Sequence, residues 1–386
     1  MDKSKIKEVC DEISKETKGT PSGSLSIGIT NTTIYGDTPT FMQVPRAYTS
    51  QDLQEANVVF MGFPVEGPCL KNITTLYPPD GPESGPDDLF RTGAQHAPRE
   101  VRKWSVFNSI HQLGGQLAYN AEADIILADY LSIVDYGDTA YVKGDLVGGH
   151  AVGRQKVREI VEAGAIPLIQ GGDHSVPIPG ILGITDCISP TERLGIIGFD
   201  SHFDLSFEEE GCKDWEKLTA ASEYRRALDT PNVEPENIVI IGIRGMLNPE
   251  SWARLAERLG IRYFTIREID EIGIEKVMEE ALERVSKGTK HLYVTLDMDV
   301  MDGAICPGQK YPATPGLTPR EIVKALRIIG KERIIGGFDI ACLSPQYDIG
   351  GATCLLAGQC FVEVLSGLAV QFRDHNIKKW YKQESL

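Results

Sequence analysis

The chain has 386 residues, with 39 Lys and Arg against 55 Asp and Glu, so its formal net charge is −16 at pH 7. A chain of this length can bury a sizeable core without disulfides or other staples. The negative charge argues against broad binding of nucleic acid or of an anionic membrane, because both need a positive field. A cationic substrate stays compatible with this charge.

The spacing of the cysteines and the hydropathy of the chain indicate where in the cell the protein is expected. No two of the eight cysteines have the C-x-x-C spacing of zinc or redox motifs, so we expect free thiols. No apolar run reaches the roughly 18 residues that a membrane span needs. Residues 1–19 carry acids and lack the apolar segment of a signal peptide. We therefore expect a cytoplasmic protein that binds neither membrane nor nucleic acid.

The predicted elements begin with a charged surface helix over residues 1–19 and an irregular Gly-, Thr- and Pro-rich stretch up to residue 56. Beyond it, short runs rich in Val and Ile alternate with longer amphipathic stretches. This alternation predicts a parallel sheet that is covered by helices on both faces. We expect a three-layer α-β-α fold with roughly eight strands, formed by one domain over 57–386 that follows an extension or arm over 1–56. The predicted strands are 58–64, 131–135, 166–170, 194–199, 238–243, 263–266, 292–296 and 334–338, and the predicted helices after residue 57 are 150–163, 250–259, 274–285, 319–329 and 354–372.

Residues 66–93 interrupt this alternation, and Pro, Gly and Asp dominate them. Long loops in compact domains are often lids or interface elements, so this segment is either such an element or a surface insertion.

Polar clusters follow three of the predicted strands. The sequence GGDHS ends at Ser175, D-x-H-x-D spans residues 200–204, and D-x-D spans residues 297–299. A lone Asp after a strand is usually a cap or a turn residue. However, the carboxyl ends of parallel strands meet at one edge of a sheet, which brings the three clusters together. So many carboxylates need a cation, and imidazoles with carboxylates suit a binuclear site for divalent metals.

These motifs, in this order, resemble the ureohydrolases, the family of arginase and agmatinase, over roughly residues 39–372. The similarity extends to PTFMQVP at 39–45, DYGD at 135–138 and GIRG at 242–245, and to the segment 339–348 near the C-terminus. The PTFM segment is typical of the agmatinase-like branch.

The resemblance implies two divalent ions, with nickel favoured and manganese as the alternative, because the branch nearest to this sequence uses nickel and arginases use manganese. It implies that the two ions activate a water for attack on a guanidinium carbon. Asp204 would hold this water and carry a proton to the departing amine. The implied metal ligands are His174, Asp200, His202, Asp204, Asp297 and Asp299.

Two positions depart from the family pattern, and both concern the substrate. Ala220 stands where an HGT-x-F segment carries a His, and Cys342 stands where a Glu grips the guanidinium through paired hydrogen bonds. A thiol offers neither the charge nor the direction of a carboxylate. His96 lies in a turn that differs slightly from the family's, and it is a second candidate for substrate contact. Asp302, just beyond the D-x-D pair, is expected to shape a turn and not to bind metal.

The resemblance and these departures together favour a hydrolase of a small guanidine, either free guanidine or an N-substituted guanidine or biguanide such as metformin. Two alternatives stay open. One is an agmatinase, a guanidinobutyrase or a formimino-acid hydrolase with a relocated clamp. The other is a weakly active partner subunit that assembles with a paralogue. The resemblance also implies trimers or hexamers.

Overall fold

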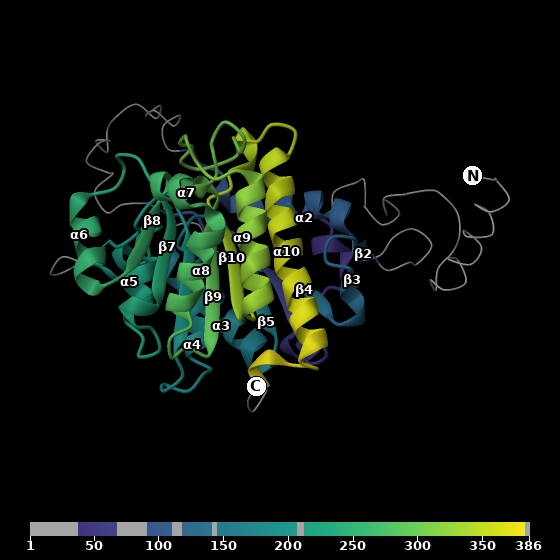
Figure 1. Ribbon diagram of the computed structural model, residues 1–386. Helices are drawn as coiled ribbons and strands as arrows, with labels where there is room; N and C mark the ends of the chain where they lie inside the picture. The colour runs from purple at the N-terminus through teal and green to yellow at the C-terminus, as the bar shows by residue number, and fades with distance from the viewer. Residues whose placement is uncertain (1–37, 68–90, 110–117, 141–144, 207–211, 383–386) are drawn as a thin grey trace.

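The computed structural model describes residues 38–67, 91–109, 118–140, 145–206 and 212–382. Eight parallel strands form one sheet in the order β4-β1-β5-β10-β9-β6-β7-β8, and helices cover both of its faces (Figure 1). This confirms the predicted three-layer architecture. The strands are β1 (Val58–Phe63), β4 (Ile133–Asp138), β5 (Ile166–Gly171), β6 (Leu194–Phe199), β7 (Ile238–Ile243), β8 (Arg262–Thr265), β9 (His291–Asp297) and β10 (Gly337–Ala341). A separate antiparallel pair joins β2 (Tyr119–Asn120) to β3 (Ile125–Ile126).

Successive side chains of each strand point to opposite faces of the sheet, so the sheet separates two apolar clusters. Phe60 belongs to the cluster beneath α8, α9 and α10, whereas Met61 belongs to the cluster beneath α3 and α4. The helices are α2 (Ala97–Trp104), α3 (Leu146–Glu162), α4 (Pro177–Thr185), α5 (Glu223–Ala227), α6 (Glu250–Leu259), α7 (Ile266–Ile272), α8 (Ile274–Val285), α9 (Pro319–Glu332) and α10 (Ala352–Asp374).

All eight predicted strands of the sheet are present, with two displaced toward the C-terminus: β4, predicted over 131–135, spans Ile133–Asp138, and the last strand is also shifted. The last was predicted over 334–338, but β10 spans Gly337–Ala341, because α9 continues to Glu332 and the buried Ile334 and Ile335 only lead into the strand. Helix α4 was not predicted, because Pro177, Pro179 and Gly180 are residue types that usually disfavour a helix. Proline is tolerated in a first helical turn. Gly180 is needed because a Cβ there would lie 2.0 Å from the hydroxyl oxygen of Tyr293.

The described part of the predicted extension, residues 38–56, packs within the core of the domain. The ring of Phe41 is fully buried and stacks on Phe60 with 4.1 Å between the centroids. Its backbone N–H donates to the carboxylate of Asp135, which also receives two hydrogen bonds from the buried Arg102. Residues of this stretch therefore contribute to the core of the domain that follows them. The predicted helix over 1–19 lies outside the described residues, as does segment 68–90 of the predicted loop.

Helix α10 is long and apolar enough to cross a membrane by length and composition, although no long apolar run was expected. Within its most apolar window, 72% of the residues are buried inside the protein; the helix packs against α9, and its Phe361 contacts Phe60 and Phe338 of the sheet. These features are those of a core helix.

Candidate metal centre

The candidate site lies at the carboxyl edge of four neighbouring strands in the middle of the sheet, β5, β10, β9 and β6. His174 follows β5, Asp200 follows β6, Asp297 ends β9 and Cys342 follows β10. Gly172 of the GGDHS motif makes room for a crossing segment, because a Cβ there would lie 2.0 Å from the carbonyl oxygen of Val65.

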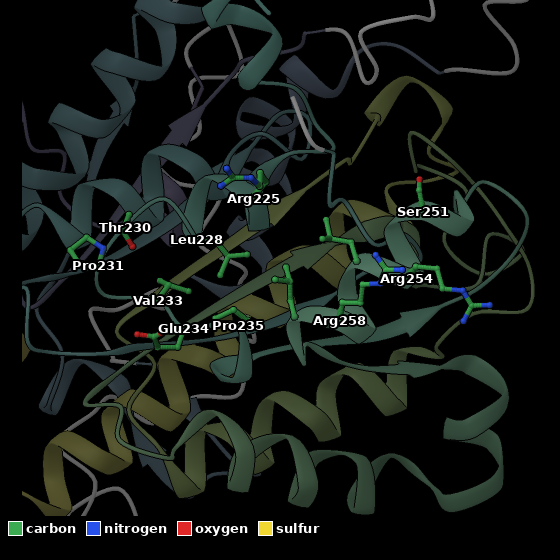
Figure 2. Close-up of a pocket in the computed structure, with 12 residues that line it drawn as sticks. Arg225, Leu228, Thr230, Pro231, Val233, Glu234, Pro235, Ser251, Arg254 and Arg258 are labelled. Carbon is green, nitrogen blue, oxygen red and sulfur yellow. The ribbon is translucent and has the colours of Figure 1, made fainter. Parts of the chain in front are cut away.

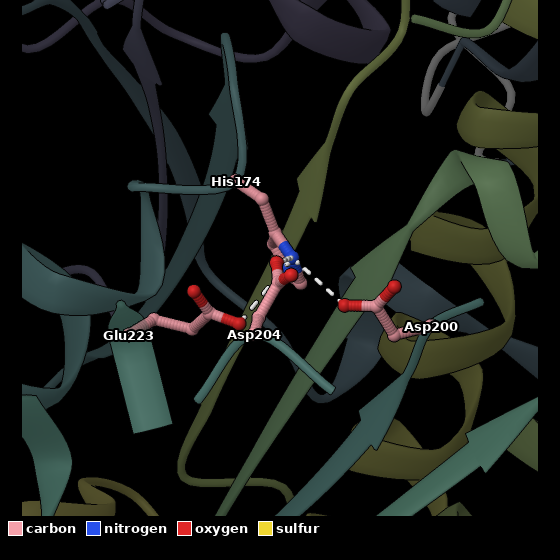
Figure 3. A group of neighbouring side chains, drawn as sticks. All are labelled: His174, Asp200, Asp204 and Glu223. Carbon is pink, nitrogen blue, oxygen red and sulfur yellow. Dashed lines mark hydrogen bonds and ion pairs between the residues drawn. The ribbon is translucent and has the colours of Figure 1, made fainter. Parts of the chain in front are cut away.

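Four carboxylates surround one nitrogen of His174. The oxygens that face its Nδ1 come from Asp200 and Asp204, each at 3.0 Å, from Asp297 at 3.3 Å and from Glu223 at 3.5 Å. Figure 3 shows Asp200, Asp204 and Glu223 pointing toward this imidazole. His174 and Glu223 are 1% and 0% exposed, so solvent does not screen these charges.

A second group shares Asp200 with the first and adds His202 and Asp299. The Nδ1 of His202 lies 3.1 Å from a carboxylate oxygen of Asp299 and 3.5 Å from one of Asp200. The other oxygen of Asp299 accepts hydrogen bonds from the backbone and hydroxyl of Ser201. Asp200 therefore joins two adjacent sets of donors.

A chain of hydrogen bonds orients His174. The hydroxyl of Thr295 donates to Asp339 at 2.8 Å, so its oxygen is left to accept from Nε2–H of His174 at 3.1 Å. With its proton on Nε2, the imidazole presents Nδ1 to a cation among the carboxylates, as metal-binding histidines do. Burial raises the pKa of Asp339 to about 6 against the lowering effect of Tyr293 and His174.

Replacing Thr295 with Val should weaken metal binding without changing a ligand. Loss of the bond to Nε2 frees the imidazole to turn, and removal of such a partner typically lowers metal affinity by about 10- to 100-fold. Competition with a chelator would measure the affinity, and Thr295→Ser, which keeps the hydroxyl, should retain it. Equal affinity in the Val variant and the wild type would show that this bond does not orient the ring.

Several buried oxygens of the site lack a hydrogen-bond partner, namely Oδ2 of Asp200, Oδ2 of Asp299 and both oxygens of Glu223. Burial and neighbouring Asp299 raise the pKa of Asp297 well above its usual range. Burial and the charge of Asp200 raise the pKa of Asp204 to about 6. A divalent cation would bind the unpartnered oxygens and offset the repulsion between the buried carboxylates. The residues present therefore fit a binuclear metal centre.

Strained backbone marks two residues of the site. Asp204 has φ 43° and Cys342 has φ 57°, a region that residues other than glycine seldom adopt. Cys342 is 1% exposed, and its backbone N–H donates to the carbonyl of Gly172. Burial raises the pKa of its thiol well above the usual value, and the charge of Asp297 beside it acts in the same direction. The thiol is therefore neutral and lies next to a candidate ligand.

The structure brings the six predicted ligands together with Cys342 but leaves His96 apart. His96 is exposed in a one-turn helix (Ala94–His96), and among the described residues no hydrogen bond or ion pair joins it to the cluster. Its role in substrate contact stays a prediction. Asp302 accepts hydrogen bonds from Ala304, Thr314 and Gly316, as expected of a residue that shapes a turn.

Glu223 was missed by the sequence analysis. It lies three residues after Ala220, in the stretch that was aligned on Tyr224 and the two arginines that follow it, and no motif marks it. Its burial depends on how α5 packs against the sheet, which is a tertiary feature. Only the proximity of an acid to an aligned aromatic residue could have signalled it.

A surface cavity of about 770 Å³ lies elsewhere, between α5 and α6 (Figure 2). Leu228, Val233 and Leu255 contribute to its wall, and Arg254 and Arg258 lie at its side. None of the candidate ligands lines it, so it is separate from the metal centre.

Comparison with known proteins supports the reading of the site. Residues 83–367 match the Arginase family, so the chain belongs to this family. It is 30% identical over 332 residues to the guanidinopropionase of Pseudomonas aeruginosa, an alignment that covers 86% of this chain and 92% of that protein. It is 28% identical to the formimidoylglutamase of Halalkalibacterium halodurans over 73% of this chain and 84% of that protein. The structure of proclavaminate amidino hydrolase from Streptomyces clavuligerus superposes with a TM-score of 0.68 at 27% identity, covering 87% of this chain and 98% of that one.

Family membership confirms the resemblance that the motifs indicated. The chain is a metal-dependent hydrolase of amidino C–N bonds, and its cluster of His and Asp residues fits the binuclear divalent centre of that family.

Proposed function

We propose that this hydrolase cleaves a C–N bond of a small guanidine, either free guanidine or an N-substituted guanidine or biguanide such as metformin. The products are urea or a substituted urea, together with ammonia or an amine. The observation that carries the proposal is the neutral, buried thiol of Cys342 beside Asp297, at the position that resembles the family's guanidinium clamp. Without a carboxylate there, a long cationic substrate loses its directional contact, whereas a compact guanidine loses less.

The proposed ligands are His174, Asp200, His202, Asp204, Asp297 and Asp299. The bound ions supply positive charge that lowers the pKa of the attacking water. Asp204 accepts a proton from that water and delivers it to the departing nitrogen, so that the leaving group departs as neutral ammonia or amine. Nickel is favoured, with manganese as the alternative, because the branch that this sequence resembles uses nickel, whereas the donor types alone do not separate the two metals. We also propose a cytoplasmic trimer or hexamer.

Two other substrates are alternatives, a guanidino acid and a formimino acid, because guanidinopropionase and formimidoylglutamase align over most of the chain. A weakly active subunit that needs a paralogue is the remaining alternative. It rests on the same two departures, Ala220 and Cys342.

A substrate screen tests these possibilities. The purified chain, loaded with nickel or with manganese, would be assayed for urea and ammonia release from guanidine, metformin, agmatine, 3-guanidinopropionate and formimidoylglutamate. We expect the highest kcat/KM for guanidine or an N-substituted guanidine, with two ions per chain. A preference for agmatine, the guanidino acid or the formimino acid would contradict the proposed substrate. No release from any compound by the two-metal protein would favour the partner-subunit alternative.

A further inference from the structure

Glu223 reaches the metal centre through the docking of α5 against the sheet. The ring of Tyr224 is fully buried, and Gly198 of β6 makes room for it, since a Cβ at that position would lie 1.7 Å from the Tyr224 hydroxyl oxygen. This contact fixes the first turn of α5 under the carboxyl edge of β6. Glu223, the first residue of α5, then lies beside the carboxylate group that follows the same strand.

The side chain of Glu223 is a buried acid at the metal centre. It is 0% exposed, and neither carboxylate oxygen has a hydrogen-bond partner among the residues that the structure describes. The nearest nitrogen is Nδ1 of His174, at 3.5 Å. The hydroxyl of Thr295 donates to Asp339, and its oxygen can accept from Nε2–H of His174, an arrangement in which Nδ1 is free to bind a cation. Burial of four carboxylates around one imidazole nitrogen is costly, and a divalent cation between these groups offsets that cost.

The spacing of the donors also agrees with a bound cation. Six-coordinate ions with bonds of about 2.1 Å hold adjacent donors about 3.0 Å apart. Four carboxylate oxygens lie 3.0 to 3.5 Å from Nδ1 of His174, and Glu223 supplies one of them. The donor atoms of His174, Asp200, Asp204 and Glu223 all lie within 4.8 Å of one another. The family motifs account for only three of the four carboxylates.

We infer that Glu223 is a fifth protein ligand of the ion held by His174, in addition to Asp200, Asp204 and Asp297. This inference rests on the proposed two-metal centre and goes beyond the ligand set that the motifs imply. An additional anionic donor holds this ion more tightly than its neighbour, whose predicted donors include His202 and Asp299. A chelator should therefore remove the ion at His202 first.

Glu223→Gln and Glu223→Ala test the inference, with Glu363→Gln as the matched control. Glu363 is also a buried glutamate, at 4% exposure, but Arg327 and Gln359 satisfy its carboxylate. Binding of Ni²⁺ and of Mn²⁺ to the chelator-stripped full chain would be measured by calorimetry, with the bound metal counted after dialysis. Thermal melts of the stripped and loaded forms would be recorded in parallel.

We expect both Glu223 variants to lose at least about 10-fold in affinity for one of two ions, since even an outer-shell change can cost this much. The rise in Tm on loading should shrink. The Tm of the stripped form should stay equal or increase, because a buried acid without a hydrogen-bond partner in the described structure is gone. Glu363→Gln should keep both affinities and lower the Tm of the stripped form.

Three outcomes overturn the inference. In the first, the Glu223 variants bind both ions with wild-type affinity. In the second, they bind both ions normally and only their KM rises, which makes Glu223 a substrate contact. In the third, the stripped and loaded forms lose the same stability, which makes its role structural. A wild-type chain that binds fewer than two ions would instead overturn the two-metal centre itself, a result seen before any variant is compared.

Discussion

Replacing Asp200 with Asn is expected to remove metal and activity together. Asp200 is the residue common to both donor groups, with one carboxylate oxygen 3.0 Å from Nδ1 of His174 and the other 3.5 Å from Nδ1 of His202. An amide nitrogen cannot replace a carboxylate oxygen that is shared by two ions, so the binding of both ions is weakened. Loss of several kcal/mol of charge stabilisation corresponds to a fall in kcat/KM of at least about 1,000-fold. Metal analysis and urea release on the same sample would measure both effects.

Asp302→Asn is the control for this experiment. It removes one carboxylate a few residues beyond the centre, in a turn where Ala304 and Thr314 hold it, and it should retain two ions and wild-type activity. Asp297→Asn should behave as the Asp200 variant does. Full activity in either Asp200→Asn or Asp297→Asn protein that has been shown to be free of metal would contradict the proposed mechanism.

The sheet is predictable from the sequence because most of its strands are short apolar runs. Both faces of the sheet are covered, so the runs of β6 and β7 are buried along their whole length and contrast with the amphipathic helices between them. Helix α4 lacks such contrast. It is buried nearly all round and contains proline and glycine, so neither periodicity nor propensity reveals it.

Some residues of the metal centre could likewise be predicted from the sequence, and others could not. His174, Asp200 and Asp297 directly follow or end strands, and the rule that the carboxyl ends of parallel strands meet places them together without a structure. Glu223 is separated from β6 by a long connection. Its position depends on the fit between Tyr224 and Gly198, which is a matter of side-chain packing. Such a fit cannot be predicted from local sequence. The same is true of the hydrogen bond between Thr295 and His174.

The identity of residue 342 is expected to control which guanidine is cleaved. Cys342 follows β10, lies between β5 and β9 at the edge of the sheet, and has a buried thiol beside Asp297. Cys342→Glu should introduce the charged clamp that similar proteins carry at this position. A charge-assisted hydrogen bond contributes about 1.5–3 kcal/mol, which is roughly a 10- to 100-fold change in selectivity. The ratio of kcat/KM for agmatine to that for guanidine should rise by this factor.

Cys342→Gln separates charge from size in this test. It fills the same space as Cys342→Glu without the charge, so it should slow compact guanidines by crowding yet leave the preference for agmatine low. Lys310 is expected to limit the gain in selectivity for agmatine. Its backbone N–H donates to the carbonyl of Cys342, and its ammonium group is paired with Glu66 at 2.7 Å. A strongly attracted Lys310 would leave Glu66 and neutralise the new carboxylate, so the change belongs at the lower end of that range. If the folded, two-metal Cys342→Glu protein has an unchanged ratio, Cys342 takes no part in recognition and is a small buried apolar residue.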